Sequence, residues 1–331
     1  PYEYDNSTEG YELAKVELKS PFEKNDENLA NGKKMYEIYC SVCHGSKGDG
    51  NGILMEREKF LGIPSYADRD ITEGVADVRL NRANKYNALS PEMFTAIHLA
   101  GEKLSQAKEV RAVVLSGNGN GFCAGLDMSS FTRMADSSSS REAQKSEQVE
   151  RAEPANYAQQ AAYIWKNLPM PVITAIHGVA YGGGAQIALG GDIRIAAPDI
   201  KMSVLEIKWG LIPDMSLTQT LRDLVSLDVA KELTFTGRVL NGDQAKEIGL
   251  VTHVDESPIQ RAFALAKEIA SKSPDAVRAG KKLLEQTWHA DERFGLELEE
   301  TLQRQLIGTS NQIEAITANF ENRAPNFSDP E

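Results

Sequence analysis

Two glycine-containing turns could direct backbone N–H groups at a single oxygen atom. The triplet 182–184 follows the apolar run 171–176, and the segment 121–127 follows the mostly apolar run 110–115. A short β-branched run that ends in glycines before apolar periodicity resumes predicts a strand, a tight turn and a helix. N–H groups at such a turn can stabilise an oxygen atom that becomes negatively charged. The two turns therefore predict an oxyanion hole, although glycines at both places would also suit close packing alone.

Two carboxylates, Glu206 and Asp214, lie eight residues apart and are candidates for proton transfer. Glu206 has apolar neighbours at 204, 205 and 207, while Asp214 follows Pro213. Two carboxylates in one apolar pocket acquire different pKa values, so that one serves as base and the other as acid. The alternatives are a glutamate on a surface strand and an aspartate that only stabilises a turn.

A third group of residues has the spacing of a haem attachment site. Cys40, Cys43 and His44 form the C-x-x-C-H pattern, in which two thiols bond the haem and the histidine binds the iron. The segment 31–50 around them resembles the front half of small bacterial cytochromes c. A zinc site would require further ligands near by. A haem attached here would be a covalent haem c bonded to Cys40 and Cys43, with His44 as the iron ligand.

The composition of the 331-residue chain is that of a globular protein, with 41% hydrophobic and 25% charged residues. A net charge of −12 argues against a nucleic-acid partner, because neutralising phosphates requires a basic surface. No run approaches the roughly 20 apolar residues of a membrane-spanning helix.

The chain divides into three parts of different character. Residues 1–74 are charged and short of aliphatic runs, residues 75–256 alternate β and α signals, and residues 257–331 are helical. The alternation predicts an α/β core with a mainly parallel sheet covered by helices. The predicted strands are 75–80, 110–115, 169–176 and 192–197, and the predicted core helices are 91–104, capped by Ser90, and 184–191.

Amphipathic spacing predicts two long helices near the C-terminus, 274–287 and 293–322. They could dock a neighbouring subunit or cover their own sheet, and the sequence leaves both alternatives open. The segment 136–154 is rich in Ser, Glu and Gln and predicts a mobile surface loop or lid.

From about Val75 to Phe320 the chain resembles the crotonase superfamily, the enoyl-CoA hydratases and isomerases. The resemblance rests on the motifs 80–89, 121–127, 176–184, 192–194 and 209–213. It implies a crotonase-like spiral of ββα units, and it implies that the N–H groups of Leu126 and Gly183 stabilise a thioester enolate. It also implies acyl-CoA as substrate, no cofactor for that chemistry, and a homotrimer or hexamer. The residues expected beside the CoA moiety are Lys85, Ala88, Leu89 and Ala124.

The acidic positions decide which reaction the resemblance favours. Hydratases of the family use two glutamates, and here the first position is Gln186 and the second is Glu206. A glutamine amide orients water but does not transfer its proton at neutral pH. Dienoyl-CoA isomerases carry an acid at the position of Asp214, although they also have an aspartate at that of Gln186. We therefore predict a Δ3-Δ2 or dienoyl isomerase with Glu206 as principal acid and base, with enoyl-CoA hydratase as the alternative.

The haem motif gives an alternative of a different class, a c-type haem electron-transfer protein. Cytochromes of this kind need a downstream sixth ligand and a closing helix, and by Val75 the chain has already entered its crotonase-like part. Haem attachment would also imply the periplasm, whereas acyl-CoA chemistry implies the cytoplasm. We therefore assign function to the second part, predict a cytoplasmic enzyme, and expect residues 1–74 to be a truncated cytochrome c-like, mainly helical fragment. Lys281 and Lys282 are candidates for contacts with the CoA phosphates, but a solvated helix face is the favoured interpretation of both.

Overall fold

The computed structural model describes residues 29–30, 33, 74–135 and 154–330. The chain separates into two compact units, residues 1–67 and 68–331, and the architecture below is that of the second unit. The predicted haem residues Cys40, Cys43 and His44 lie outside the described residues. Most of the predicted lid, 136–153, lies outside them as well.

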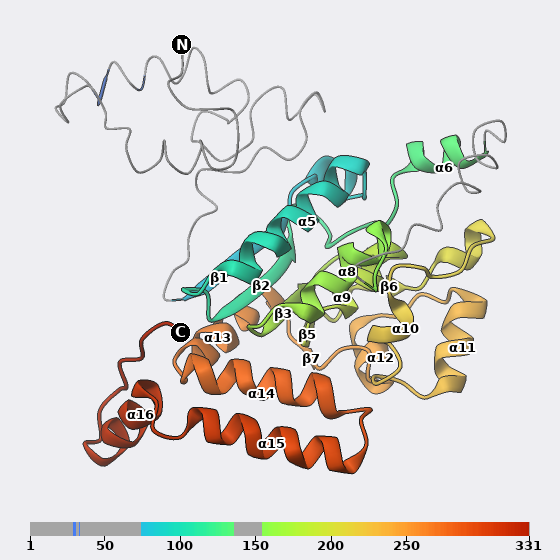
Figure 1. The fold of residues 1–331 in the computed structure, drawn as a ribbon. Coiled ribbons are helices and arrows are strands. Elements are labelled where there is room, and N and C mark those ends of the chain that lie inside the picture. The colour runs from blue at the N-terminus through green and yellow to red at the C-terminus, as the bar shows by residue number, and fades with distance from the viewer. Residues whose placement is uncertain (1–28, 31–32, 34–73, 136–153, 331) are drawn as a thin grey trace, which may run out of the picture. The chain divides into compact units, whose positions relative to one another are not determined.

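A five-stranded parallel sheet forms the centre of this unit, in the order β1-β2-β3-β5-β7 (Figure 1). Its strands are β1 (Val75–Leu80), β2 (Ala112–Gly117), β3 (Val172–Ile176), β5 (Ile193–Ala196) and β7 (His253–Val254). A second parallel sheet pairs β4 (Val179–Tyr181) with β6 (Lys201–Ser203). The α/β prediction is confirmed, whereas the sequence did not predict the short strands β4, β6 and β7.

Both faces of the main sheet are covered, because every residue of its central strands β2 and β3 is buried. Side chains alternate between the faces of a strand. Val114 and Ile173 pack on one face against α13 (Pro258–Ala270), whereas Val113 and Val172 belong to the larger core on the opposite face. Residues buried on both faces are typical of parallel sheets covered by helices.

Helices account for most of the remaining structure. Helix α5 (Pro91–Gln106) begins as predicted, because the Ser90 side chain accepts a hydrogen bond from the Met93 N–H and Pro91 occupies the first position. Among the described residues, no helix is both long and apolar enough to span a membrane. The other helices of the described residues are α6 (Met128–Ala135), α8 (Tyr157–Asn167), α9 (Gly183–Leu189), α10 (Leu217–Thr220), α11 (Leu227–Thr236), α12 (Gly242–Glu247), α14 (Pro274–Thr287), α15 (Glu292–Leu306) and α16 (Ser310–Phe320). Two short 3-10 turns are η1 (Ala83–Lys85) and η2 (Glu206–Trp209).

The C-terminal region is helical, but the predicted helix 293–322 is wrong as a single element. Gly308 has a φ of +84°, which ends α15, and the Thr309 side chain caps α16 by accepting from the Gln312 N–H. A glycine in the left-handed conformation ends one helix, and a capping threonine directly after it begins the next. The helix α14 has the predicted bounds and packs beside α15 (Figure 1).

Two basic side chains join α14 to the core. Arg278 donates to the carbonyls of Ala107 and Val110 after α5, and Lys281 donates to the Met170 carbonyl at 3.1 Å and to Asp192 at 2.7 Å. Only 9% of the Lys281 side chain is exposed. The expectation of a solvated lysine here is therefore wrong, and so is that of a CoA ligand, because the ammonium group is used in holding α14 against the sheet.

We predict that Lys281→Met lowers the free energy of unfolding by about 3 kcal/mol, because it leaves the Asp192 carboxylate without its cation in a buried setting. Burial already raises the pKa of Asp192 against the opposing effect of the Lys281 ammonium. Lys282→Met is the matched control, since its side chain is exposed and its substitution should change stability by about 0.5 kcal/mol or less. Urea unfolding of both variants gives the comparison, and equal losses would contradict the assignment.

Candidate active site

Three turns meet at the carboxyl ends of β1, β2 and β3. They are the segments 81–89, 118–127 and 177–184, which directly follow these parallel strands; the third segment contains β4 and the first two residues of α9. The Asn87 side chain joins the first two, because its amide donates to the Gly121 carbonyl at 2.8 Å and to the Phe122 carbonyl at 3.1 Å. Its oxygen accepts from the Arg82 N–H at 2.8 Å. Ligand sites of parallel sheets lie at this edge.

Backbone contacts then hold the turns together. Leu89 pairs with Leu126, and Cys123 pairs with Ala180, each as a single parallel bridge. At Gly184 a Cβ would lie 2.3 Å from the Cys123 carbonyl oxygen, so the close approach of the second and third turns requires glycine there.

The two N–H groups predicted to form an oxyanion hole lie in neighbouring turns. A Cβ built on Gly125 would lie 3.6 Å from the Gly183 nitrogen. Among the hydrogen bonds of the described residues, neither the Leu126 N–H nor the Gly183 N–H donates to a protein acceptor. Neither N–H group is therefore used by an acceptor within the described part of the chain, as the predicted oxyanion hole requires.

A buried hydrogen bond joins Gln186 to Glu206. The Gln186 amide donates from Nε2 to Glu206 Oε1 at 2.6 Å, and Gln186 Oε1 accepts from the Met215 N–H at 2.8 Å. Because a backbone donor fixes the amide oxygen, the amide nitrogen must face the carboxylate. Glu206 opens η2 and is buried, so the alternative of a surface strand is wrong.

The Glu206 carboxylate borders the third turn. A Cβ on Gly182 would lie 3.3 Å from Glu206 Oε1, and one on Gly183 would lie 2.7 Å from the Met215 sulfur and 2.9 Å from the Leu89 side chain. Glu206 Oε2 is buried without a hydrogen-bond partner among the described residues. The site thus combines a buried carboxylate oxygen with an apolar wall next to Gly183.

Burial raises the pKa of Glu206, and the charge of Asp214 raises it further, while the hydrogen bond from Gln186 lowers it. Desolvation also raises the pKa of Asp214, although this residue is exposed to solvent. The charge of Asp214 therefore affects the ionisation of Glu206, although no hydrogen bond joins the two carboxyls in the described part of the chain.

The segments expected beside CoA also lie together. The Ala124 N–H donates to the Tyr86 carbonyl at 2.8 Å, which aligns residues 85–89 with residues 123–126. Lys85 is exposed in η1, whereas Ala88 and Leu89 are buried. The two segments expected beside the CoA moiety, 85–89 and 123–126, therefore lie next to one another.

The sequence analysis did not assign roles to four residues of this neighbourhood, namely Asn87, Met215, Arg82 and Asp127. Asn87 and the preceding Tyr86 both have left-handed backbones, with φ of 55° and 50°. Asparagine tolerates that conformation, which is a signal that local sequence could have offered. The others depend on contacts across more than twenty residues, which no local pattern reveals.

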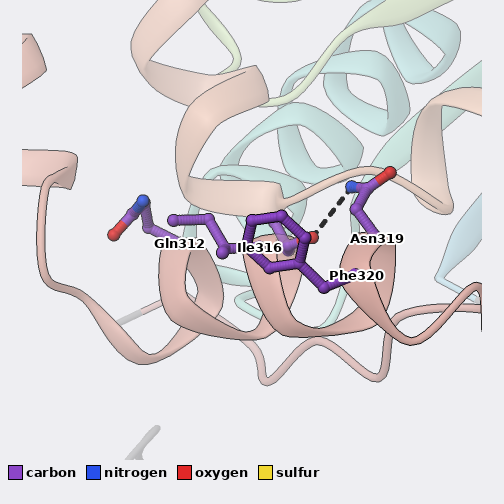
Figure 2. A pocket seen from close by; sticks show the side chains of 5 residues that line it. Gln312, Ile316, Asn319 and Phe320 are labelled. Carbon is purple, nitrogen blue, oxygen red and sulfur yellow. Dashed lines mark hydrogen bonds between the residues drawn. The ribbon is translucent and has the colours of Figure 1, made fainter.

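A shallow pocket on α16 lies apart from these residues. Figure 2 shows its lining side chains, which include Gln312, Ile316, Asn319 and Phe320. None of the candidate catalytic residues contributes to it.

We predict that Glu206 titrates above the ordinary pH range of a glutamate and that Gln186→Met raises its pKa further, because the hydrogen bond that favours the charged form is lost. The chemical shift of the 13C-labelled side-chain carboxyl measures both values, with Glu206→Gln to assign the signal. Gln219→Met removes an exposed glutamine and should leave the titration unchanged. An ordinary pKa in the unmodified protein would contradict the burial argument.

Comparison with known proteins agrees with this architecture. Residues 70–330 match the Enoyl-CoA hydratase/isomerase family. The mitochondrial methylglutaconyl-CoA hydratase of Mus musculus is 34% identical over 77% of this chain and 79% of its own, and the peroxisomal Delta(3,5)-Delta(2,4)-dienoyl-CoA isomerase of Arabidopsis thaliana is 32% identical over 83% and 99%. The crystal structure of an enoyl-CoA hydratase from Bacillus anthracis superposes with a TM-score of 0.69 at 31% identity, covering 77% of this chain and 95% of that one. The chain is therefore an enzyme of the enoyl-CoA hydratase/isomerase family, the crotonase superfamily that its motifs resemble.

Proposed function

We propose that the protein is an enoyl-CoA isomerase that moves the double bond of a 3-enoyl-CoA, or of a dienoyl-CoA, toward the thioester. The observation that carries the proposal is the buried hydrogen bond from the Gln186 amide to Glu206 Oε1. It places a group that cannot exchange a proton at neutral pH where a second acid would otherwise stand. One carboxyl is then left to perform the proton transfers.

A single carboxyl is enough for isomerisation. The Glu206 carboxylate removes a proton from C2, and the electron pair moves into the conjugated thioester to give a dienolate. Protonated Glu206 then returns that proton to C4, so that the double bond ends between C2 and C3. The raised pKa of Glu206 suits a group that must both accept and release a proton.

The N–H groups of Leu126 and Gly183 have the roles of oxyanion donors in this proposal. They stabilise the negative charge on the thioester oxygen of the dienolate, a contribution that typically amounts to about 3 kcal/mol for each donor. Lys85, Ala88, Leu89 and Ala124 would lie along the CoA moiety. Acyl-CoA chemistry in this family needs no cofactor.

Asp214 is the candidate partner of Glu206 in a dienoyl isomerase. Its charge raises the pKa of Glu206, which supports electrostatic communication between the two carboxyls. Enoyl-CoA hydratase is the second candidate function, because the mouse relative is named a hydratase. In that case Glu206 would act alone on water held near the Gln186 amide.

Assembly and location are further proposals. Exposed apolar side chains in the helical C-terminal region, such as Trp288, Ile316 and Phe320, support assembly with further copies of the chain, and the resemblance to the family favours a homotrimer or hexamer. The cytoplasmic location stays a prediction from the substrate class.

We predict that Glu206→Gln lowers kcat by about 10²- to 10⁴-fold while the fold is kept, because the amide neither accepts nor returns the proton. In the unmodified enzyme kcat/KM should fall as the pH drops through the raised pKa of Glu206, since only the carboxylate removes the C2 proton. The measurement is conversion of a 3-enoyl-CoA at unchanged mass, followed by chromatography and mass spectrometry. Glu256→Gln, at an exposed position, is the matched control.

The same assay separates the two candidate functions. A 2-enoyl-CoA that gains the mass of one water, without conversion of the 3-enoyl substrate, would establish a hydratase and overturn the isomerase proposal. Full activity of Glu206→Gln would instead remove Glu206 from the mechanism under either function.

The haem motif of Cys40, Cys43 and His44 leads to a separate prediction. We expect no covalent haem, because the sequence lacks the second half of a cytochrome c. The protein is produced together with haem-maturation machinery, denatured, and its visible spectrum recorded. A Soret band that survives denaturation, and that is lost in Cys40→Ser/Cys43→Ser, would favour the electron-transfer alternative.

A further inference from the structure

A buried ion pair joins the first turn, which contains Arg82, to the second turn, which contains Asp127. Arg82 and Asp127 are 7% and 9% exposed. Arg82 Nη1 donates to Asp127 Oδ2 and also to the Ala88 carbonyl at 3.2 Å. Asp127 Oδ1 accepts from the Ser129 N–H at 2.8 Å and from the Ser129 hydroxyl at 2.6 Å.

The Asp127 carboxyl of this pair is ionised at neutral pH. The hydrogen bonds from Ser129, opposed by burial and assisted by Arg82, lower the pKa of Asp127 to about 2. Burying two charges costs much of what their attraction returns, and well-packed apolar residues often replace such a pair without loss of stability. The stability of the fold is therefore a weak explanation for a charged pair at this place.

The position of the pair suggests a different explanation. Asp127 directly follows Leu126, and its own N–H donates to the Leu89 carbonyl at 3.1 Å. On the other side of Leu126, the Gly125 carbonyl accepts from the Leu89 N–H at 2.8 Å. In a planar trans peptide the carbonyl and the N–H point in opposite directions. The bond to Gly125 therefore turns the Leu126 N–H away from the first turn.

The direction of the Leu126 N–H thus depends on how Leu89 sits beside residues 125–127. Arg82 holds both partners of that contact, because one guanidinium nitrogen bonds the carbonyl of Ala88, next to Leu89, and the carboxylate of Asp127, next to Leu126. A shift of either segment would rotate the Gly125–Leu126 peptide.

We infer that Arg82 and Asp127 are positioning residues that aim the Leu126 N–H at the substrate's thioester oxygen. The inference rests on the proposed oxyanion role of Leu126. The pair touches no reacting atom, and it acts through the Ala88–Leu89 and Leu126–Asp127 backbone. It should therefore affect the stabilisation of the enolate more than the binding of CoA.

The variants are chosen to separate positioning from stability. Arg82→Met leaves the Asp127 carboxylate buried without its cation, whereas Arg82→Met/Asp127→Asn removes both charges and keeps an acceptor for Ser129. Arg82→Lys retains the charge but offers a compact ammonium in place of the guanidinium. The control is Arg79→Met, which removes an arginine paired with Asp77 on the same part of the chain, with 41% of its side chain exposed.

Three quantities are measured for each variant: the melting temperature, kcat and KM for the enoyl substrate, and the absorption maximum of a bound dialkylaminocinnamoyl-CoA. The absorption of this thioester moves to longer wavelength when its carbonyl is polarised, so it reports the oxyanion donors without turnover.

We expect Arg82→Met to lower kcat by about 10- to 100-fold, less than complete loss of a donor, with KM changed by less than about threefold. The red shift should shrink in parallel. The double variant should regain melting temperature without regaining kcat or the red shift, and Arg82→Lys should recover part of both. Arg79→Met should resemble the unmodified enzyme.

The results that would overturn the inference fall into two kinds, according to whether the proposed oxyanion role of Leu126 survives. If the unmodified enzyme shows a red shift that the variants keep, or if kcat returns with stability in the double variant, the pair is structural and the oxyanion proposal survives. If the unmodified enzyme binds the probe and shows no red shift, the oxyanion proposal fails and the positioning role fails with it.

Discussion

The candidate site depends on backbone segments that approach more closely than side chains would allow. Two donors can converge on one oxygen only if the turns that carry them are adjacent, and here Cys123 contacts Gly184 at a distance that excludes a Cβ. The bridges Leu89–Leu126 and Cys123–Ala180 fix these segments in register. The parallel sheet supplies the remaining condition, because its strands bring all three turns to one edge.

The same crowding explains the electrostatics of the acidic group. Glu206 is buried against Gly182, where little water can solvate a carboxylate, and its pKa rises for that reason. Gln186 moderates this effect, because its donated hydrogen bond favours the charged form. A carboxylate at position 186 would do the opposite, since two buried like charges disfavour each other's ionisation.

Much of this site was predictable from local sequence, and the limits have physical causes. Glycines at strand ends and the motif 80–89 indicated the turns, because their backbone requirements are local. The break at Gly308 was missed because amphipathic spacing continues across it, so periodicity outweighed a single left-handed residue. Lys281 was assigned to solvent because its partners, Asp192 and the Met170 carbonyl, come from loops far away in the sequence. The hydrogen bond between Gln186 and Glu206 is likewise invisible to local sequence patterns, because twenty residues separate the two side chains, although each is a candidate site residue by itself.

The charges of the proposed mechanism are consistent with the arrangement of these groups. When Glu206 takes a proton from the substrate, the negative charge moves from the carboxylate to the thioester oxygen, so the number of charges in the pocket is unchanged. The pKa of Asp127 lies near 2, so this carboxylate, held beside Arg82, keeps its charge and takes no part in the transfer. A neutral amide at position 186 adds no charge in either state. In the proposed mechanism one negative charge therefore moves between a buried carboxyl and two backbone N–H groups, and a second buried carboxylate in place of Gln186 would oppose that charge at both of its positions.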